Sequence, residues 1–377
     1  MKIGFLCKRH YTGHDVIADR FGRLYEIPRQ LAMLGHDVRG YCLDYHHARG
    51  DGQWAHDMPI GSLAWESRSL GRLRLSALAD YPMRLPQHLR RFSPDILIGA
   101  SDIPHIALVA WLSRKLGIPY VVDLYDNFES FGQARIPGFI GLLKRSVRDA
   151  DLVIAVSDPL KRKVEREYGV KGKVLTMPNG VDRSLFHPTD PARARARLGL
   201  PIDAELVGTA GGLTREKGLE VLYAAWTSLE RLRPKAHLVL AGPVDDDLPP
   251  PRGMRVHYLG QLPHVHIADL FNSLNVGVIT ALDSPFGRYC FPQKAYEMLA
   301  CGLPVVASDT GVMSELLADR PQFLYPADDA EALAEAICRQ LDQPLRIELP
   351  IYDWQELRSA IETEILGIVR LYDMPNR

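Results

Sequence analysis

The chain has 377 residues, more than one hydrophobic core usually serves, so we expect two domains. Its 46% hydrophobic and 24% charged residues are typical of a soluble globular protein. A formal net charge of -1 gives no overall attraction to nucleic acid, and no such partner is expected. No apolar run is long enough for a membrane span, and the first residues do not form a signal peptide. Five cysteines without a C-x-x-C pair favour reduced thiols and a cytoplasmic protein.

Short apolar runs alternate with stretches of helical periodicity along the whole chain. Near-continuous apolar runs of this length favour strands that are buried on both faces of a parallel sheet. The alternation therefore predicts an α/β fold of two Rossmann-like, doubly wound parallel-sheet domains that face an interdomain cleft. The expected strands are Lys2–Cys7, Val38–Leu43, Asp95–Gly99, Pro119–Leu124, Leu152–Val156, Glu205–Ala210, His237–Ala241, Val256–Leu259, Val276–Thr280 and Pro304–Ala307, and the clearest helices are Phe21–Leu34, His105–Leu116 and Leu219–Leu232.

Turn residues indicate a domain boundary near the middle of the chain. The Met-Pro-Asn-Gly turn at 177–180 is followed by an Ala/Arg-rich segment. We expect an N-terminal domain at residues 1–185 and a C-terminal domain at residues 186–354. The stretch Trp354–Arg370 alternates apolar and charged residues at helical spacing. A helix over about residues 355–377 is therefore expected to pack back on the N-terminal domain.

The stretch Phe291–Gly311 carries the most informative pattern. Pro292 suits the first position of a helix because its missing N–H is not needed there, and Gly302 suits the helix end. Lys294 and Glu297 lie three residues apart and thus share a helix face. A carboxylate one turn into such a helix can accept two ribose hydroxyls, while the helix N-terminus offers N–H groups to phosphate. The alternative is an exposed Lys294–Glu297 ion pair of little energetic value.

A second stretch, Thr209–Gly218, directly follows an expected strand. Gly211 and Gly212 allow a backbone to approach a diphosphate closely. Lys217 can place a positive charge on that diphosphate, and Arg215 can add a forked contact. The spacing matches neither a Walker loop nor G-x-G-x-x-G. An ordinary strand-to-helix loop with solvated charges is the alternative interpretation.

These two stretches, together with the Pro-Asn-Gly-Val-Asp segment at 178–182, resemble family 4 of the retaining glycosyltransferases, which have the GT-B fold. The resemblance covers nearly the whole chain. It implies transfer of a sugar from a UDP- or GDP-sugar to a hydroxyl acceptor (class EC 2.4), with the donor in the C-terminal domain. Further matching segments are Gly35-His36-Asp37-Val38, Pro94-Asp95-Ile96, Leu116-Gly117-Ile118-Pro119, Val156-Ser157 and Phe186 with Pro188.

The resemblance also implies roles for single residues. The implied catalytic residues are Lys217 on the donor diphosphate, Glu297 on the ribose and Asp126 at the reacting sugar. The acceptor side would comprise Gly13, Tyr125 and Asp126. No cofactor is expected, because the nucleotide sugar is itself a substrate. No metal is expected either, because no DxD-type acidic pair stands at the end of an expected strand beside the donor loop. The implied donor-binding residues are Gly211, Gly212, Arg215, Lys217, Arg288, Tyr289, Pro292, Lys294, Glu297 and Gly311, with segment 283–290 around the sugar.

The chain departs from the family pattern at three positions. Gly212 stands where an arginine is usual, Tyr289 stands where a second glutamate is usual, and Tyr125 replaces a common histidine. A substantial branch of the family carries the Pro-x-Lys-x-x-Glu pattern seen here. Two alternatives remain open: a GT-B nucleotide-sugar epimerase and a non-catalytic nucleotide-sugar-binding subunit.

Basic residues in the expected acceptor domain suggest contact with a membrane. Segment 136–145 sets apolar residues beside basic ones, a pattern that suits an interfacial element on anionic lipid. We therefore expect peripheral contact with the inner face of the plasma membrane and a lipid-linked glycan acceptor, as in cell-surface polysaccharide synthesis. The alternative is a helix packed on its own sheet with a solvated basic face. The clustered basic residues of this domain are Arg68, Arg72, Arg74, Arg84, Arg90 and Arg91.

A pair of histidines, His264-x-His266, is expected to lie in a surface loop rather than in a metal site.

Overall fold

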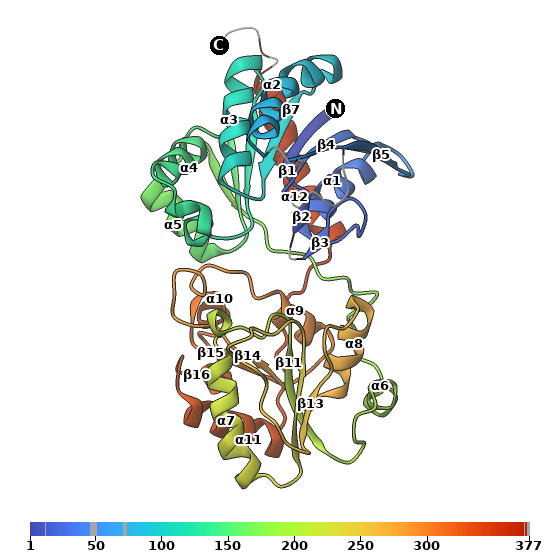
Figure 1. Ribbon diagram of the computed structural model, residues 1–377, viewed down its shortest axis with the longest axis vertical. Helices are drawn as coiled ribbons and strands as arrows, with labels where there is room; N and C mark the ends of the chain where they lie inside the picture. Colours follow the sequence, from blue (N-terminus) through green and yellow to red (C-terminus); the bar gives the residue numbers. More distant parts are fainter. Residues whose placement is uncertain (12, 46–50, 71–73, 373, 375–377) are drawn as a thin grey trace. The chain divides into compact units, whose positions relative to one another are not determined.

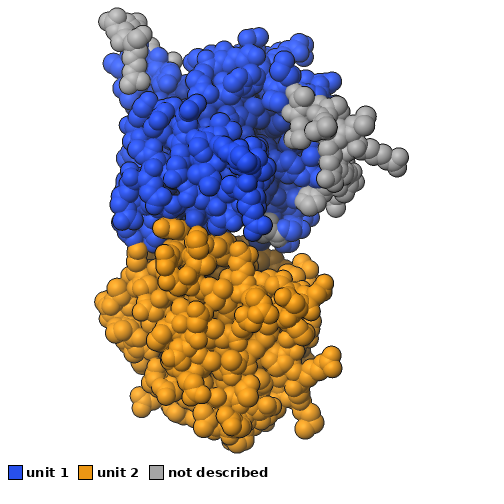
Figure 2. All heavy atoms as spheres, turned by 60° about the vertical axis from the view of Figure 1, so that its left-hand side comes forward, with its two compact units in different colours: residues 1–180, 354–377 blue, residues 181–353 orange. Residues whose placement is uncertain are grey.

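The computed structural model describes residues 1–377 except 12, 46–50, 71–73, 373 and 375–377. The chain divides into two compact units, which are distinguished by colour in Figure 2. Unit 1 comprises residues 1–180 and 354–377, and unit 2 comprises residues 181–353. Each unit is built on its own sheet with helices packed against it (Figure 1). The expected α/β class with two doubly wound domains is confirmed.

Unit 1 contains an eight-stranded sheet in the order β10-β9-β8-β7-β1-β4-β6-β5. All neighbouring strands are parallel except β5, which runs antiparallel to β6 at one edge. A short hairpin, β2–β3, follows β1. The strands are β1 (Lys2–Lys8), β2 (His10–Tyr11), β3 (His14–Asp15), β4 (Asp37–Asp44), β5 (Gly52–His56), β6 (Ser62–Ser69), β7 (Ile96–Ala100), β8 (Tyr120–Leu124), β9 (Leu152–Ala155) and β10 (Lys173–Thr176).

Helices cover the unit 1 sheet, and every residue of β7, β8 and β9 is buried beneath them. Burial on both faces is the reason that these strands read as continuous apolar runs. Helix α3 begins where Asp102 accepts a hydrogen bond from the His105 backbone N–H and ends at Gly117, whose φ is 70°. The helices are α1 (Arg23–Met33), α2 (Arg74–Phe92), α3 (Ile103–Leu116), α4 (Phe139–Arg148), α5 (Asp158–Tyr168) and α12 (Trp354–Tyr372), with 3₁₀ turns η1 (Phe128–Ser130) and η2 (Gly132–Arg135).

A buried ion pair joins α1 to β8 in unit 1. Arg23 Nη2 lies 2.7 Å from Asp123 Oδ1, and neither side chain is exposed. Arg23 Nη1 also donates to the Met177 carbonyl at 2.9 Å and to Asn179 Oδ1 at 3.1 Å. The guanidinium therefore holds the Pro-Asn-Gly turn against the sheet, which accounts for a fully buried arginine.

The C-terminal helix α12 belongs to unit 1, where it packs beside α1. His36 Nε2 lies 3.0 Å from Glu362 Oε1, and the Tyr372 hydroxyl donates to Asp151 at 3.2 Å. Unit 2 begins at residue 181, five residues before the boundary expected from the sequence. Residue 181 belongs to unit 2 because the Val181 backbone N–H donates to the Tyr352 carbonyl at 2.9 Å.

Unit 2 contains a parallel six-stranded sheet in the order β13-β12-β11-β14-β15-β16. The strands are β11 (Glu205–Ala210), β12 (Ala236–Ala241), β13 (Val256–Tyr258), β14 (Val276–Ile279), β15 (Val305–Ser308) and β16 (Leu324–Tyr325). The helices are α6 (Pro191–Leu198), α7 (Leu219–Leu232), α8 (His264–Ser273), α9 (Gln293–Ala300), α10 (Gly311–Leu316) and α11 (Ala330–Asp342), with 3₁₀ turns η3 (Arg215–Lys217) and η4 (Pro321–Phe323).

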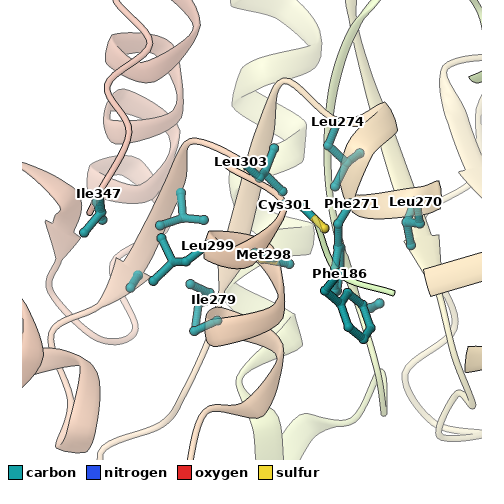
Figure 3. Close-up of a cluster of buried hydrophobic side chains, with 14 of the residues drawn as sticks. Phe186, Leu270, Phe271, Leu274, Ile279, Met298, Leu299, Cys301, Leu303 and Ile347 are labelled. Atoms are coloured by element: carbon teal, nitrogen blue, oxygen red, sulfur yellow. The ribbon is translucent and has the colours of Figure 1, made fainter. Parts of the chain in front are cut away.

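One face of α9 is anchored in the core of unit 2. Met298 and Leu299 lie among Phe186, Phe271 and Leu303 in a single apolar cluster (Figure 3). Each side chain of this kind stabilises the fold by about 1.5–3 kcal/mol on burial. The helix is therefore fixed in rotation about its axis, and this fixes the directions of the polar side chains on its remaining faces.

Candidate functional site

The strand order of unit 2 creates a switch point between β11 and β14. The chain runs from β11 outward through β12 and β13, and then crosses to the other side of β11 to form β14. Loops that follow adjacent strands on the two sides of such a point diverge and leave room for a ligand. The loop after β11, at residues 211–218, belongs to the stretch Thr209–Gly218, and the loop after β14, at residues 280–292, leads into α9 at the start of the stretch Phe291–Gly311. The fold thus brings both stretches to one sheet edge.

The glycine loop after β11 has a backbone that side chains would obstruct. Gly211 has a φ of 100°, and its N–H donates to the Ala241 carbonyl at 3.0 Å. A Cβ on the facing Gly242 would lie 1.9 Å from the Gly211 carbonyl oxygen, so both positions require glycine. The loop closes in the 3₁₀ turn η3 and at Gly218, whose φ is 74°. Because residues 211 and 212 are both glycine, neither has a side chain that would cover the backbone at this point of the loop.

Two lysines meet next to this loop. The Lys217 ammonium lies 3.1 Å from the position of a Cβ built on Gly212. The Lys294 ammonium, from α9, donates to Thr209 Oγ1 at 3.3 Å. Burial, and secondarily the charge of Lys217, lowers the pKa of Lys294 to about 7. No carboxylate among the described residues lies within 4.0 Å of either ammonium, so the exposed Lys294–Glu297 ion pair considered from the sequence does not form.

Glu297 lies one turn further along α9 and is 8% exposed. Its Oε1 accepts a hydrogen bond from Gln293 Nε2 at 3.0 Å and lies 3.8 Å from His264 Nε2. Its Oε2 has no hydrogen-bond partner within the part of the chain that the structure describes. One carboxylate oxygen is therefore held in place, while the other is available to a ligand hydroxyl.

Two expectations about helix starts are corrected by the structure. Pro292 is the N-cap of α9 rather than its first residue, because the Ala295 N–H donates to the Pro292 carbonyl and the helix begins at Gln293. The His264-x-His266 pair is not a surface loop but the first turn of α8. His264 packs edge-on against Phe186 at 5.2 Å between ring centroids, and this packing fixes its ring beside Glu297.

The loop after β14 packs against the start of α10. Gly311 has a φ of 57°, and a Cβ there would lie 2.5 Å from the Gly287 carbonyl oxygen. The exposed Arg288 side chain forms a forked ion pair with Asp283, with Nη2 2.9 Å from Oδ2. Tyr289 is half-buried and donates its backbone N–H to the Phe286 carbonyl. The guanidinium of Arg288 is therefore engaged within its own loop. Gly311 does contact this loop, as expected if both belong to one donor site.

Arg215 is also committed to neighbouring acidic side chains. Its guanidinium pairs with Glu220, and its Nε lies 3.8 Å from Asp247 Oδ2. Its backbone N–H donates to Asp245 at 3.2 Å. These contacts hold Arg215 on the outer side of the loop, whereas Lys217 lies at Gly212.

Sequence reasoning missed Thr310, the N-cap residue of α10. Its side chain is 5% exposed, and its Oγ1 has no hydrogen-bond partner among the described residues. An unpaired buried hydroxyl is costly, and it is compensated when a ligand accepts its hydrogen. The sequence did contain a signal for Thr310. It directly precedes Gly311, after the buried strand β15, and the carboxyl ends of such strands form the sheet edge where ligands bind.

The predicted acceptor residues lie at the strand ends of unit 1. Gly13, in the turn between β2 and β3, has a φ of 83° and open space at its Cβ position. Tyr125 is buried, and its hydroxyl donates to the Ser101 carbonyl at 2.9 Å, so it has a structural hydrogen bond. Asp126 follows it, half-buried, and accepts a hydrogen bond from the Asn127 N–H at 2.7 Å. Lys8, which the sequence did not single out, places its ammonium 5.9 Å from the Tyr125 ring centre.

The basic cluster of unit 1 is partly neutralised. Arg68 pairs with Asp51 and lies 3.0 Å from Asp80, which also pairs with Arg84 at 2.6 Å. Arg90 and Arg91, at the end of α2, are exposed. Arg72 and the side chain of Arg74 lie outside the described residues.

Segment 136–145 is a clearer surface feature. Ile136, Ile140 and Leu142 are 47%, 38% and 41% exposed, while the buried face of α4 contributes Leu143 and Val147 to the core. The helix therefore packs against α3 and α5 and still presents apolar side chains to solvent, so packing within unit 1 and an exposed apolar face are not exclusive. No helix in the described part of the chain is long and apolar enough to cross a membrane.

Comparison with known proteins agrees with this geometry. Residues 23–185 match the model of Glycosyltransferase Family 4, and residues 204–343 match that of Glycosyl transferases group 1. TuaC of Bacillus subtilis, named as a teichuronic acid biosynthesis glycosyltransferase, is 31% identical over 66% of this chain; the match spans 62% of its own length, less than two thirds. D-inositol 3-phosphate glycosyltransferase 1 of Catenulispora acidiphila is 30% identical over 70% of each chain.

The solved structure of sucrose-phosphate synthase from Thermosynechococcus elongatus superimposes with a TM-score of 0.71 over 98% of each chain, at 23% identity. That likeness extends over both units and confirms the GT-B fold class. The family matches cover both domains, including the glycine loop and the Glu297 region of α9. The chain therefore belongs to family 4 of the glycosyltransferases, the transferases of class EC 2.4 that the sequence pattern predicted.

Proposed function

We propose that the chain is a retaining glycosyltransferase that takes a UDP- or GDP-sugar as donor in unit 2. The observation that carries the proposal is the convergence of Lys217, Lys294 and Glu297 at the switch point of one sheet. Among the described residues neither ammonium has a carboxylate partner, which suits a diphosphate, and one oxygen of Glu297 has no hydrogen-bond partner, which suits a ribose. The whole proposed donor set adds Gly211, Gly212, Arg215, Arg288, Tyr289, Pro292 and Gly311.

The proposed chemistry needs little from protein acids and bases. The acceptor oxygen bonds to the anomeric carbon while the bond from that carbon to the phosphate oxygen breaks. The electron pair leaves with the nucleoside diphosphate, which takes the acceptor proton on the same face of the sugar. Catalysis then consists of positioning and of stabilising the charge that develops on the leaving diphosphate. Lys217 and the backbone N–H of Gly212 are the groups proposed for that task, since the Gly211 N–H already donates to the Ala241 carbonyl, and Asp126 is the proposed group at the reacting sugar.

The acceptor is proposed to be a lipid-linked or membrane-proximal glycan. The support is the exposed apolar face of segment 136–145, which stands beside the exposed basic side chain of Arg145. An element of this composition binds at the interface of an anionic membrane. The arginine cluster contributes less to this proposal than its sequence suggested, because Arg68 and Arg84 share Asp80.

Turnover separates this proposal from the two alternatives. Incubation of the protein with UDP-glucose, GDP-mannose and UDP-N-acetylglucosamine, each with and without a polyprenyl-linked glycan, should release nucleoside diphosphate. Release is expected to be stimulated by the acceptor. An epimerase would change the configuration of the sugar, and a binding subunit would retain the intact donor. Activity is expected to persist in EDTA; loss in EDTA that magnesium or manganese restores would contradict the metal-independent mechanism.

A further inference from the structure

We propose that Glu129 is a positioning residue for the turn that carries Asp126, which it fixes through ion pairs with Lys144 and Lys163. The inference rests on the proposed function, in which Asp126 lies at the reacting sugar. It adds a residue outside the proposed donor and acceptor sets, and it specifies how unit 1 holds the Asp126 carboxylate in place.

The turn after β8 is a compact unit around Asp126. Oδ1 of Asp126 accepts the Asn127 N–H at 2.7 Å, and the Asn127 side chain in turn accepts the Glu129 N–H at 3.3 Å as the N-cap of η1. Phe128 is buried, and its ring meets the ring of Tyr125 with 5.1 Å between centroids. A displacement of this turn would therefore move the Asp126 carboxylate as well.

The Glu129 side chain connects this turn to α4 and α5, which lie side by side (Figure 1). Its Oε2 lies 2.9 Å from the Lys163 ammonium of α5, and its Oε1 lies 3.2 Å from the Lys144 ammonium of α4. The Lys163 side chain is 7% exposed, so its charge requires a partner inside the protein. Each oxygen of the carboxylate thus contacts a different helix, and the turn is held at two points.

A second carboxylate shares the same two lysines. Glu167 of α5 lies 2.6 Å from the Lys163 ammonium and 3.9 Å from the Lys144 ammonium. Two carboxylates and two ammonium groups therefore balance within one network. Burial alone would raise the pKa of Glu129, but hydrogen bonds and charge from Lys163 and Lys144 outweigh burial and lower that pKa. Glu129 is therefore ionised at neutral pH, where its ion pairs persist.

The contact between α4 and α5 does not depend on Glu129 alone. Leu143 and Val147 of α4 are fully buried, and Glu167 provides a carboxylate for the lysines of both helices. Loss of Glu129 should therefore loosen the turn around Asp126 more than it loosens the two helices. A misplacement of about 1 Å at a reacting group can lower a rate by about a hundredfold, so this loosening should affect turnover.

Steady-state kinetics of Glu129→Gln and Glu167→Gln test the assignment. Each variant removes one carboxylate from the same network, but Glu167 lies on α5 and not on the acceptor turn, so Glu167→Gln is the matched control. The substrates are UDP-glucose, GDP-mannose or UDP-N-acetylglucosamine with a polyprenyl-linked glycan. Glu129→Gln should lower kcat by about tenfold or more, and Glu167→Gln by less than about twofold.

Two further measurements separate positioning from a general loss of structure. Melting curves should show both variants folded, and calorimetry should give the wild-type Kd for the nucleotide sugar in each, because the proposed donor site lies in unit 2. Lys144→Arg, which keeps a positive charge beside Glu129, should retain kcat within about twofold, whereas Lys144→Gln should lower it by about threefold or more.

The outcomes distinguish this inference from the proposed function. Unchanged kcat in Glu129→Gln, or equal losses in Glu129→Gln and Glu167→Gln, would overturn the positioning role and leave the glycosyltransferase proposal standing. A weaker Kd for the nucleotide sugar in Glu129→Gln would also overturn it, since the effect would then not belong to the acceptor turn. A wild type that releases no nucleoside diphosphate from any of the three donors would overturn the proposed function and this inference together.

Discussion

Glu297 holds one carboxylate oxygen against Gln293, and its other oxygen has no hydrogen-bond partner in the described part of the chain. Its replacement by alanine should leave the core of α9 intact, because Met298 and Leu299 anchor that helix. The loss of charge-assisted hydrogen bonds to two ribose hydroxyls should weaken nucleotide binding by about 2–4 kcal/mol. Calorimetry with UDP and GDP measures this loss, and Glu335→Ala on the exposed face of α11 is the control. Unchanged affinity in Glu297→Ala would show that the ribose binds elsewhere.

Lys217 should matter more than Arg215, although both stand in the same loop. Arg215 is paired with Glu220 and Asp247, whereas Lys217 has no carboxylate within 4.0 Å among the described residues. Lys217→Ala should lower kcat as well as affinity, because its contact with phosphate strengthens as charge develops on the leaving group; about 1.5–3 kcal/mol is expected. Steady-state kinetics of the two alanine variants decide the order. A greater loss in Arg215→Ala would mean that Arg215 supplies the charge missing at Gly212.

At the scale of single residues, the sequence indicates which residue types form the proposed site but not which groups they pair with through hydrogen bonds or ion pairs. The spacing of Lys294 and Glu297 and the glycines of the β11 loop could be read directly, because helix periodicity and φ preferences are local properties. The engagement of Arg288 by Asp283, and that of the Tyr125 hydroxyl by the Ser101 carbonyl, depend on how loops fold. The contact of Lys294 with Thr209 spans 85 positions and could not be read from spacing.

At the scale of elements, the Arg23–Asp123 pair links α1, β8 and the Pro-Asn-Gly turn. Asp123→Ala should destabilise unit 1 by about 3–5 kcal/mol, because it leaves a buried guanidinium without its counter-charge. Urea unfolding followed by tryptophan fluorescence measures the change. Arg339→Ala, which breaks an exposed pair with Glu335, should change stability by less than about 0.5 kcal/mol. A loss in Asp123→Ala as small as that control would contradict the structural role of the pair.

The buried strands could be predicted, whereas most edge strands could not. All ten expected strands are present. Nine of them lie inside a sheet and are apolar runs covered on both faces, and the tenth is the edge strand β13. The strands β2, β3, β5, β6, β10 and β16 were missed. The strand β6 alternates buried with partly exposed residues, and β5, β10 and β16 lie at sheet edges where only short or mixed patterns are needed.

The exposed apolar side chains of α4 and the preceding turn should mediate binding to an anionic surface. A variant with Ile136, Ile140 and Leu142 changed to serine should lose co-sedimentation with phosphatidylglycerol vesicles. Wild-type binding should weaken as salt rises, because the Debye length is only about 8 Å at physiological ionic strength. Arg90→Gln with Arg91→Gln, on α2, should have a smaller effect. Absence of wild-type binding at low salt would leave a soluble acceptor as the better interpretation.

At the scale of the whole molecule, the central claim is that unit 2 binds a nucleoside diphosphate and its sugar. The strand order, the glycine loop and α9 all support that claim. It does not depend on the fold alone, since a wrong role for any single residue would leave the fold unchanged. The sequence could establish the two-domain organisation because each half repeats the strand–helix alternation. It could not identify the base, since the residues that would contact a base have no fixed spacing from the glycine loop.

The most direct test is a thermal-shift screen of the wild type and Glu297→Ala against UDP, GDP, ADP and their sugars. A ligand at 100 times its Kd stabilises the folded state by about 2.7 kcal/mol. For a unit of this size, the shift corresponds to a rise in Tm of about 5–10 °C. We expect one family of nucleotides to produce this rise in the wild type and to produce much less in Glu297→Ala. No rise with any of these nucleotides, or an equal rise in both proteins, would contradict the donor site proposed for unit 2.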